Sequence, residues 1–221
     1  MKNLHITIDL ETASLKSNAA IIQIAAVAWD IDAKTLKKRP SLYDGTNPYI
    51  FNEHADLCTC LVNGLDFDHD TIQWWASQSD EAKANLVDSN FELVPIKEMI
   101  IDFYEWIRAT KKALHADEVI IWAQGTDSDI AILRTVSQIL GIKDLPWQYF
   151  NVRDSRTFIK TMCELMKIKE DSEVFNMPID ENFNTFVKGG KHNALYDALQ
   201  STWNVFTIRN IMKDKLFHTN K

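Results

Sequence analysis

The chain has 221 residues, of which 46% are hydrophobic and 25% are charged. This composition excludes an intrinsically disordered chain, and the length is typical of a single domain, because cores tend to split beyond roughly 250 to 300 residues. The net charge of -7 excludes the strongly basic surface on which passive polyanion-binding modules depend.

The acidic excess lies in the first part of the chain. Residues 1–150 carry 13 basic and 22 acidic side chains, whereas residues 151–221 carry 11 basic and 9 acidic ones. Some feature of the first part therefore collects carboxylates.

The cysteines and the apolar segments indicate in which cellular compartment the protein is found. Three cysteines cannot all pair within one chain, and a domain of this size needs no disulfide scaffold. The N-terminus has polar and acidic residues where a signal peptide is continuously apolar. The longest apolar run, residues 21–31, is interrupted by Gln23 and Asp30, so nothing approaches the ~18 residues of a membrane span. We expect a soluble cytoplasmic protein without a membrane partner.

Three strands are predicted near the N-terminus. Residues 4–10 alternate between apolar and polar side chains, which predicts a strand with one buried face. Residues 21–31 are almost continuously apolar and predict a central strand covered on both faces, and Tyr49 to Phe51 indicate a third strand. Between them, residues 34–48 predict a turn-rich, partly basic loop.

Two short helices and one long helix follow. Asp70 or Thr71 can cap a helix TIQWWASQ, and Asp80 can cap a second helix, EAKANLV. Apolar residues recur at helical spacing from Pro95 to about His115, which predicts the long helix.

The remaining elements predict an α/β fold. VIIWA at 119–123 indicates a buried strand, and Asp129 to Leu140 a helix that Gly141 ends. Inward positions of that helix are Ile132, Leu133, Val136, Ile139 and Leu140. Residues 154–168 indicate another helix, residues 170–190 a polar loop, and residues 193–216 a long final helix. The order β, β, β, α, β, α predicts a mixed sheet flanked by helices in a single domain.

Two carboxylates stand at the end of the first strand. Asp9 and Glu11 are two residues apart, so their side chains lie on the same face of the sheet, within reach of one cation. Such a pair is often only a solvated strand end. Here it follows a strand with buried neighbours, where two carboxylates call for a metal or a basic partner.

Further candidates follow the later buried strand. In QGTDSD, Gly125 permits a tight turn, Asp127 can act as a helix cap, and Asp129 then falls in the first turn. Asp129 is four residues before Leu133, which would hold that side of the helix against the core. We therefore favour Asp129 over Asp127 as the functional carboxylate.

The last candidates are His192 and Asp197 at the start of the final helix. Placed in the second turn, Asp197 would lie near a histidine on the leading loop, after the flexible pair Gly189 and Gly190. Either residue alone is unremarkable on a surface. As a set, the four carboxylates and the histidine are chemically complete for two divalent cations and a base.

These residues resemble the three motifs of the DEDDh family of 3'-5' exonucleases, which have a ribonuclease H-like fold. The matching segments are Asp9-Leu10-Glu11-Thr12, Asp129 with Leu133, and His192-x-Ala194-x-x-Asp197-Ala198. The tyrosine subtype would have Tyr where Asn193 stands, so the histidine subtype is indicated. Many relatives have Phe where this chain has Ser128.

Two further segments, Thr71 to Trp75 and Asn151 to Thr157, are similar to the phage exonuclease A group of this family. The resemblance spans residues 4–200. We assign one 3'-5' exonuclease domain to residues 1–221, with a motif-bearing core at about 4–210.

The resemblance implies a mechanism and a ligand set. Asp9 would bridge two divalent cations, Mg2+ or Mn2+, Glu11 and Asp197 would complete the first site, and Asp129 would act directly or through water. His192 would take a proton from the attacking water, and nucleoside 5'-monophosphates would be released from a 3' end. Hard oxygen ligands fit these ions better than zinc.

The substrate is expected to be single-stranded nucleic acid. The phage exonuclease A resemblance favours DNA as the substrate, with RNA as the alternative. If a phage encodes the chain, the expected location is the host cytoplasm. Expected substrate contacts are Leu10, Thr12, Trp74 and Arg153, with Arg156 as a second phosphate contact. Adjacent Trp74 and Trp75 cannot face one way on a helix, so we expect one of them in the core.

Two alternative functions and the oligomeric state are left open by the sequence. A zinc module could use His54, Cys58, Cys60 and His69, although Cys-x-Cys is not the usual spacing. A non-catalytic nucleic-acid-binding or scaffold protein could keep the fold without activity, which the presence of all five motif residues disfavours. A homodimer is compatible with the sequence.

Overall fold

The computed structural model describes residues 3–31, 49–84, 86, 92–169, 172, 175 and 190–218. The strands are β1 (Asn3–Thr12), β2 (Ile21–Trp29), β3 (Ile50–Asp56), β4 (Leu93–Pro95), β5 (Glu118–Ala123) and β6 (Val152–Asp154). The helices are α1 (Leu57–Val62), α2 (His69–Ser77), α3 (Asp80–Ala84), α4 (Ile96–Ala113), α5 (Asp129–Ile139), α6 (Ser155–Met166) and α8 (Ala194–His218), with a 3-10 turn, η3 (Tyr149–Asn151).

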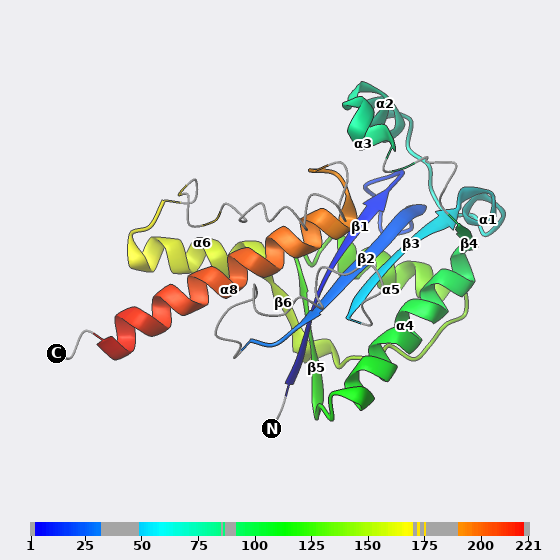
Figure 1. The fold of residues 1–221 in the computed structure, drawn as a ribbon. Coiled ribbons are helices and arrows are strands. Elements are labelled where there is room, and N and C mark those ends of the chain that lie inside the picture. Colours follow the sequence, from blue (N-terminus) through cyan, green and yellow to red (C-terminus); the bar gives the residue numbers. More distant parts are fainter. Residues whose placement is uncertain are drawn as a thin grey trace.

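The strands form one mixed sheet in the order β4-β3-β2-β1-β5-β6 (Figure 1). β2 runs antiparallel to both β1 and β3, whereas β1, β5 and β6 are parallel to one another. The α/β fold with a mixed sheet and flanking helices is confirmed. The expected loop at 34–48 and most of the polar segment at 170–190 lie outside the described residues.

Helices cover both faces of the sheet. Helices α4 and α5 pack on one face, against the even-numbered side chains of β1, such as Ile6 and Ile8. Helices α8 and α6 pack on the other (Figure 1). There, Trp29 and Trp122 share a core cluster with α8 residues such as Ala194 and Leu195. Among the described residues, no helix combines the length and apolarity that crossing a membrane requires.

Strand β1 corrects the expectation of one buried face. His5 and Thr7, on its polar side, are 6% and 0% exposed. Trp122 Nε1 donates to His5 Nδ1 at 2.9 Å, and Trp29 Nε1 donates to Thr7 Oγ1 at 3.0 Å. Because these bonds satisfy the buried polar atoms, an alternating strand can lie in the middle of the sheet.

Several predicted boundaries are wrong, mostly at short elements. The α2 cap is Asp68, which accepts from Thr71 N at 2.9 Å, not Asp70 or Thr71. Asp80 is the first residue of α3, and Ser79 Oγ accepts from Ala82 N there. Ile139 is 44% exposed and not inward. Strands β4 and β6 and helix α1 were not predicted, because three to six residues are too few to show a periodicity.

Candidate metal centre

Three carboxylates meet where β1 passes the first turn of α8. Asp9 and Glu11 lie on the β1 face that α8 covers, and Asp197 lies in the first turn of α8, not in the second as expected. One oxygen from each of the three lies within 4.8 Å of the others. Residues 188 positions apart in the sequence therefore form one acidic cluster.

Buried amides fix the start of α8 beside this cluster. Gln23, the β2 partner of Glu11, accepts from Ala194 N at 3.1 Å and donates to Asn52 Oδ1 at 2.8 Å. Asn193 caps the helix by accepting from Leu195 N at 3.0 Å. Sequence reasoning missed the role of Gln23, although an amide inside the apolar run IIQIAAV was the available signal.

Asp129 approaches the cluster from the other side. The last β1 to β5 pair is Ile8 with Ala123, so β1 extends beyond its neighbour and leaves room for the loop that leads to α5. Helix α5 begins at Asp129, which is 6% exposed, and its carboxylate accepts from the Leu10 backbone N–H. Asp127 is exposed, and Ser128 occupies the cap position instead.

Burial disfavours charge on all four carboxyls, and repulsion from the other cluster carboxyls adds to it for Asp9 and Glu11. Burial is the largest cause for each of them, and it raises the pKa of Glu11 to about 8 and that of Asp129 to about 7. The pKa of Asp9 is also raised well above its usual range, by burial and then by Asp129, Glu11 and Asp197. Burial raises the pKa of Asp197, while the His192 N–H lowers it. Carboxylate oxygens that converge in a buried place fit a divalent metal ion.

His192 stands directly over Asp197. Its backbone, at φ 66°, lets the N–H donate to Asp197 Oδ2 at 3.0 Å. The imidazole packs edge-on against Trp74 and Trp75 of α2, with ring centroids 5.0 and 6.1 Å apart. Helix α2 therefore forms a wall for the histidine, a contact that the sequence did not reveal.

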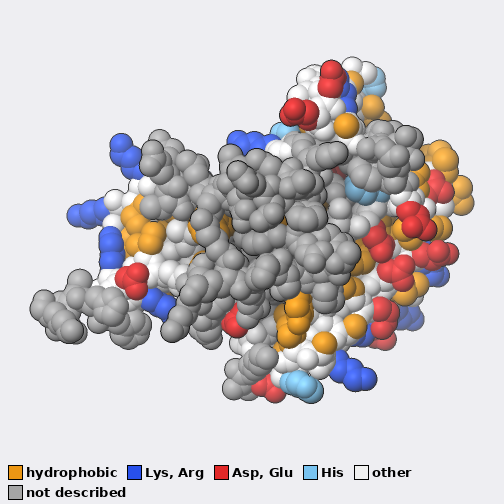
Figure 2. All heavy atoms as spheres, viewed as in Figure 1, with side chains coloured by type: hydrophobic (Ala, Val, Ile, Leu, Met, Phe, Trp, Pro, Cys, Tyr) orange, Lys and Arg blue, Asp and Glu red, His pale blue; other side chains and the backbone are white. Residues whose placement is uncertain are grey.

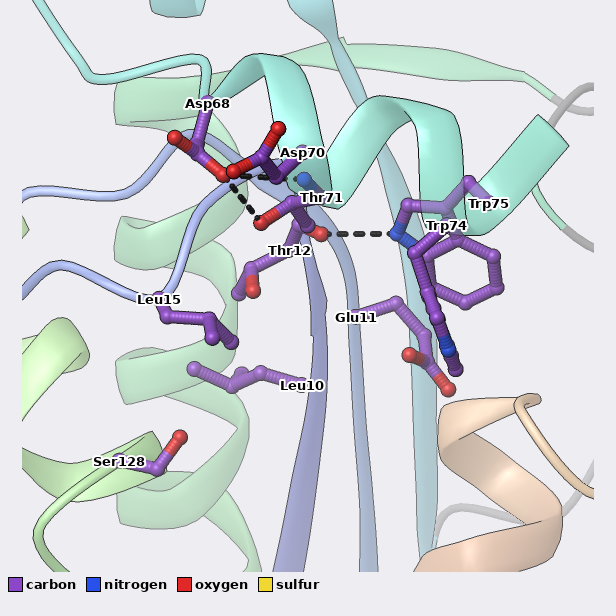
Figure 3. A pocket seen from close by; sticks show the side chains of 10 residues that line it. All are labelled: Leu10, Glu11, Thr12, Leu15, Asp68, Asp70, Thr71, Trp74, Trp75 and Ser128. Carbon is purple, nitrogen blue, oxygen red and sulfur yellow. Dashed lines mark hydrogen bonds between the residues drawn. The ribbon is translucent and has the colours of Figure 1, made fainter. Parts of the chain in front are cut away.

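A pocket of about 560 Å³ adjoins the acidic cluster (Figure 3). The predicted contacts Leu10, Thr12 and Trp74 line it. Trp74 is 44% exposed, whereas Trp75 is 7% exposed and donates from Nε1 to the Thr12 carbonyl at 3.0 Å. The expectation that one tryptophan belongs to the core is therefore confirmed. The remaining wall residues include some that sequence reasoning missed, namely Leu15, Asp68, Asp70 and Ser128.

Arg153 does not line this pocket. It is exposed on β6 and donates to the carbonyls of Phe150 and Val152 at 2.8 and 2.9 Å. Arg156 lies closer to the cluster, because its charge lowers the pKa of Asp129 and its Nη2 donates to the Gln124 carbonyl at 3.4 Å. Asp154, which lies between the two arginines, caps α6 by accepting from Thr157 N at 2.7 Å.

The zinc alternative finds no support in the described part of the chain. All four of its candidate ligands are described, yet the group of three carboxylates is the one potential metal-binding set found there. Cys58 is exposed on α1, whereas Cys60 is buried with its Sγ against the Ile21 carbonyl.

Comparisons with known proteins agree with this geometry. A family model described as the 3'-5' exoribonuclease Rv2179c-like domain matches residues 4–209. An exodeoxyribonuclease of Enterobacteria phage T4 is 27% identical over 167 residues, which are 70% of each chain.

Two solved structures share the fold. One is the nuclease domain of 3'hExo, a DEDDh family member bound to rAMP: it is 13% identical, with 96% of this chain and 93% of that chain covered, and a TM-score of 0.50. The other is the cell-death related nuclease 4 (CRN-4), which is 16% identical with a TM-score of 0.54. The match covers 96% of this chain and 64% of CRN-4.

Proposed function

Because the chain belongs to the Rv2179c-like family of 3'-5' exoribonuclease domains and is a 3'-5' exonuclease, we propose that it is of the DEDDh type and that Asp9, Glu11, Asp129 and Asp197 form a two-cation site. Asp9 would contact both cations, Glu11 and Asp197 would complete one site, and Asp129 would serve the other. The supporting observation is the convergence of Asp9, Glu11 and Asp197 within 4.8 Å.

The donor set favours Mg2+ or Mn2+. Carboxylate oxygens are hard ligands, and no thiol or second imidazole accompanies them among the described residues. When bound, two such ions lower the pKa of an attacking water and neutralise charge on the phosphate and the leaving 3' oxygen. Glu11 is only 8% exposed, and this burial strengthens its electrostatic interaction with a bound cation.

His192 is proposed as the general base. An imidazole can accept a proton near neutral pH, and the hydrogen bond from the His192 backbone to Asp197 holds the residue beside the carboxylates. Its ring lies against the exposed Trp74, which lines the pocket. A water molecule placed between the cluster and this ring would lose its proton to the imidazole.

The pocket is proposed to take the terminal nucleoside. Its volume of about 560 Å³ suits a small ligand. Trp74 offers an exposed ring on which a base can stack, which is worth about 1–3 kcal/mol, and Leu10 and Thr12 line the approach from β1. Cleavage at the adjoining carboxylates would then release a nucleoside 5'-monophosphate.

Single-stranded DNA is proposed as the first substrate and RNA as the second. The phage T4 relative is named an exodeoxyribonuclease, which supports DNA. The family model is named for an exoribonuclease, which supports RNA. A cytoplasmic location, in the host if a phage encodes the chain, is proposed on the same phage relative.

One assay tests the function with a matched pair of variants. We expect the wild type with Mg2+ or Mn2+ to release mononucleotides from a 3'-labelled single strand. Asp129→Asn should lower the rate at least about a hundredfold, because a lost ligand removes several kcal/mol of charge stabilisation. The exposed neighbour Asp127→Asn should stay within about twofold.

Matched DNA and RNA oligomers in this assay decide the sugar preference. Faster degradation of RNA would reverse the proposed order of substrates. Equal losses in the Asp129 and Asp127 variants would contradict the assignment of the second ligand site. A scaffold protein would release no nucleotide at all.

A further inference from the structure

The surroundings of the carboxylate cluster are electrostatically unequal. On one side, Asp68 and Asp70 of the α2 region line the pocket. On the other side, the β6 to α6 segment exposes Arg153, Arg156 and Lys160. Figure 2 shows a similar division, with acidic side chains over α2, α3 and the side of α4, and basic ones around α6 and the outer part of α8. A polyanion leaving the site meets attraction on the α6 side.

The β6 to α6 segment is anchored to the loop that leads to Asp129. Asp154 accepts from Thr126 N at 3.0 Å and from Thr157 N at 2.7 Å, so one carboxylate joins that loop to α6. Ser155 Oγ donates to the Ala123 carbonyl at 3.2 Å, at the end of β5. Arg156, in the first turn of α6, donates from Nη2 to the carbonyl of Gln124 at 3.4 Å, where the loop to Asp129 begins. The basic side chains therefore begin beside the cluster.

Two exposed aromatic residues continue this surface along the sheet edge. Tyr149 is 80% exposed and Phe150 is 55% exposed, and their rings meet edge to face with centroids 5.2 Å apart. Arg153 pairs with Trp122 in the sheet, so its side chain leaves on the face that α6 and α8 cover. Phe150 precedes Asp154 by four residues, so it lies at most about 13 Å from it along the chain, at a strand rise of about 3.3 Å per residue.

Basic side chains interleaved with exposed aromatic rings are the combination that binds single strands, because phosphates meet cations while bases stack on the rings. A protein partner or a second copy of the chain would also cover the aromatic pair. Neither would account for basic residues running from this pair to the Asp129 side of the cluster.

Building on the proposed exonuclease function, we propose that the 5' part of the single-stranded substrate leaves the site over the start of α6 and the outer edge of β6. Arg156 and Lys160, four residues apart on one face of α6, contact its phosphates together with Arg153. Tyr149 and Phe150 stack on bases several nucleotides from the 3' end. The surface therefore acts on long substrates and not on dinucleotides.

The test compares kcat/KM for a single strand of about 12 nucleotides, within the usual footprint of such surfaces, with kcat/KM for a dinucleotide. Both substrates are DNA or both are RNA, whichever the wild type degrades faster. In the double variant Tyr149→Ser/Phe150→Ser, the ratio of the long to the short substrate should fall about tenfold or more. The matched control Leu61→Ser/Val62→Ser changes two exposed apolar residues on α1 and should leave the ratio within about twofold of wild type.

Salt dependence tests the charged part of the surface. Lys160→Gln should make the slope of log(kcat/KM) against log[salt] for the long strand about 0.7 less steep, because one phosphate contact is lost. Lys97→Gln, at an exposed position on α4, is the control and should leave the slope unchanged.

The outcomes separate this proposal from the proposed function. If the wild type degrades both substrates and neither the ratio nor the salt slope responds to the variants, the strand path is wrong and the exonuclease function stands. If the two control variants change the ratio and the salt slope as much as the test variants do, the strand path is also wrong. If the wild type degrades neither substrate, the proposed function fails, and the path fails with it.

Discussion

Replacing Glu11 by glutamine should stabilise the metal-free protein and remove its activity. Burial, with repulsion from Asp197 and Asp129, raises the pKa of Glu11 from 4.5 to about 8. The folded state therefore binds this proton more tightly than the unfolded state, and the protein loses stability as the pH rises from about 4.5 to about 8. Glutamine keeps the shape of the side chain and carries no charge, so the variant does not lose this stability.

The size of the effect follows from the two pKa values. The difference between 4.5 and about 8 corresponds to roughly 5 kcal/mol. Neighbouring carboxyls that take up protons in place of Glu11 reduce the observable gain to about 2–4 kcal/mol at pH 8. At pH 5 most of the folded wild type is already protonated at Glu11, so the gain should fall below about 1 kcal/mol.

Urea unfolding in EDTA at both pH values measures this difference. Glu98→Gln, an exposed substitution on α4, controls for the general effect of removing a negative charge. With saturating Mn2+ the order should reverse, since the ion stabilises the folded wild type by mass action and binds the variant more weakly. A Glu11→Gln gain that is the same at pH 5 and pH 8, or that the control reproduces, would refute the reasoning.

Three further predictions concern residues around the site and one remote carboxyl. Gln23→Ala removes the side chain that accepts from the N–H of Ala194. We therefore expect the free energy of unfolding in urea to fall by about 1–3 kcal/mol and Mn2+ binding in calorimetry to weaken. Unchanged Mn2+ affinity would show that Gln23 does not position Asp197. Trp74→Ala should raise KM about tenfold and lower kcat, because the His192 ring loses the aromatic side chain against which it packs. Trp74→Phe should bring both KM and kcat much closer to the wild-type values. Equal kinetic constants in the two variants would exclude a role for the ring. Burial, with Asp102 and Glu92, raises the pKa of Glu53 from 4.5 to about 7, so the stability of the wild type falls as the pH rises through this range. Glu53→Gln should therefore be more stable than the wild type by about 1 kcal/mol at pH 8, after solvent screening, and by almost nothing at pH 4.5. A stability gain that does not depend on pH would contradict this.

The sequence predicted the long elements because their patterns are long enough to be read. β2 appears as a continuous apolar run, and α4 shows helical spacing over 18 residues. β4 and β6 have three residues each and are held by pairing with β3 and β5, an interaction that no local pattern records. The burial of His5 was missed for a related reason, since its partner Trp122 is 117 residues away.

The residues of the carboxylate cluster could be named from the sequence, but the residues that support them could not. Asp9 and Glu11 follow from strand alternation, and the placement of Asp129 and Asp197 beside them depends on tertiary packing. Gln23 and Asp154 hold helices and loops in place by accepting hydrogen bonds from backbone N–H groups. Such contacts join segments that are distant in the sequence, so single-chain patterns do not reveal them.

The central claim is that the carboxylate cluster holds the cations that cleave a 3' terminus. The most direct measurement is the release of labelled mononucleotide from the 3' end of a single strand as Mn2+ is titrated, with wild type and Asp9→Asn side by side. Release by the wild type should rise with Mn2+ and cease in EDTA, and the folded variant should release essentially none. Comparable release by Asp9→Asn, or release by the wild type in EDTA, would contradict it.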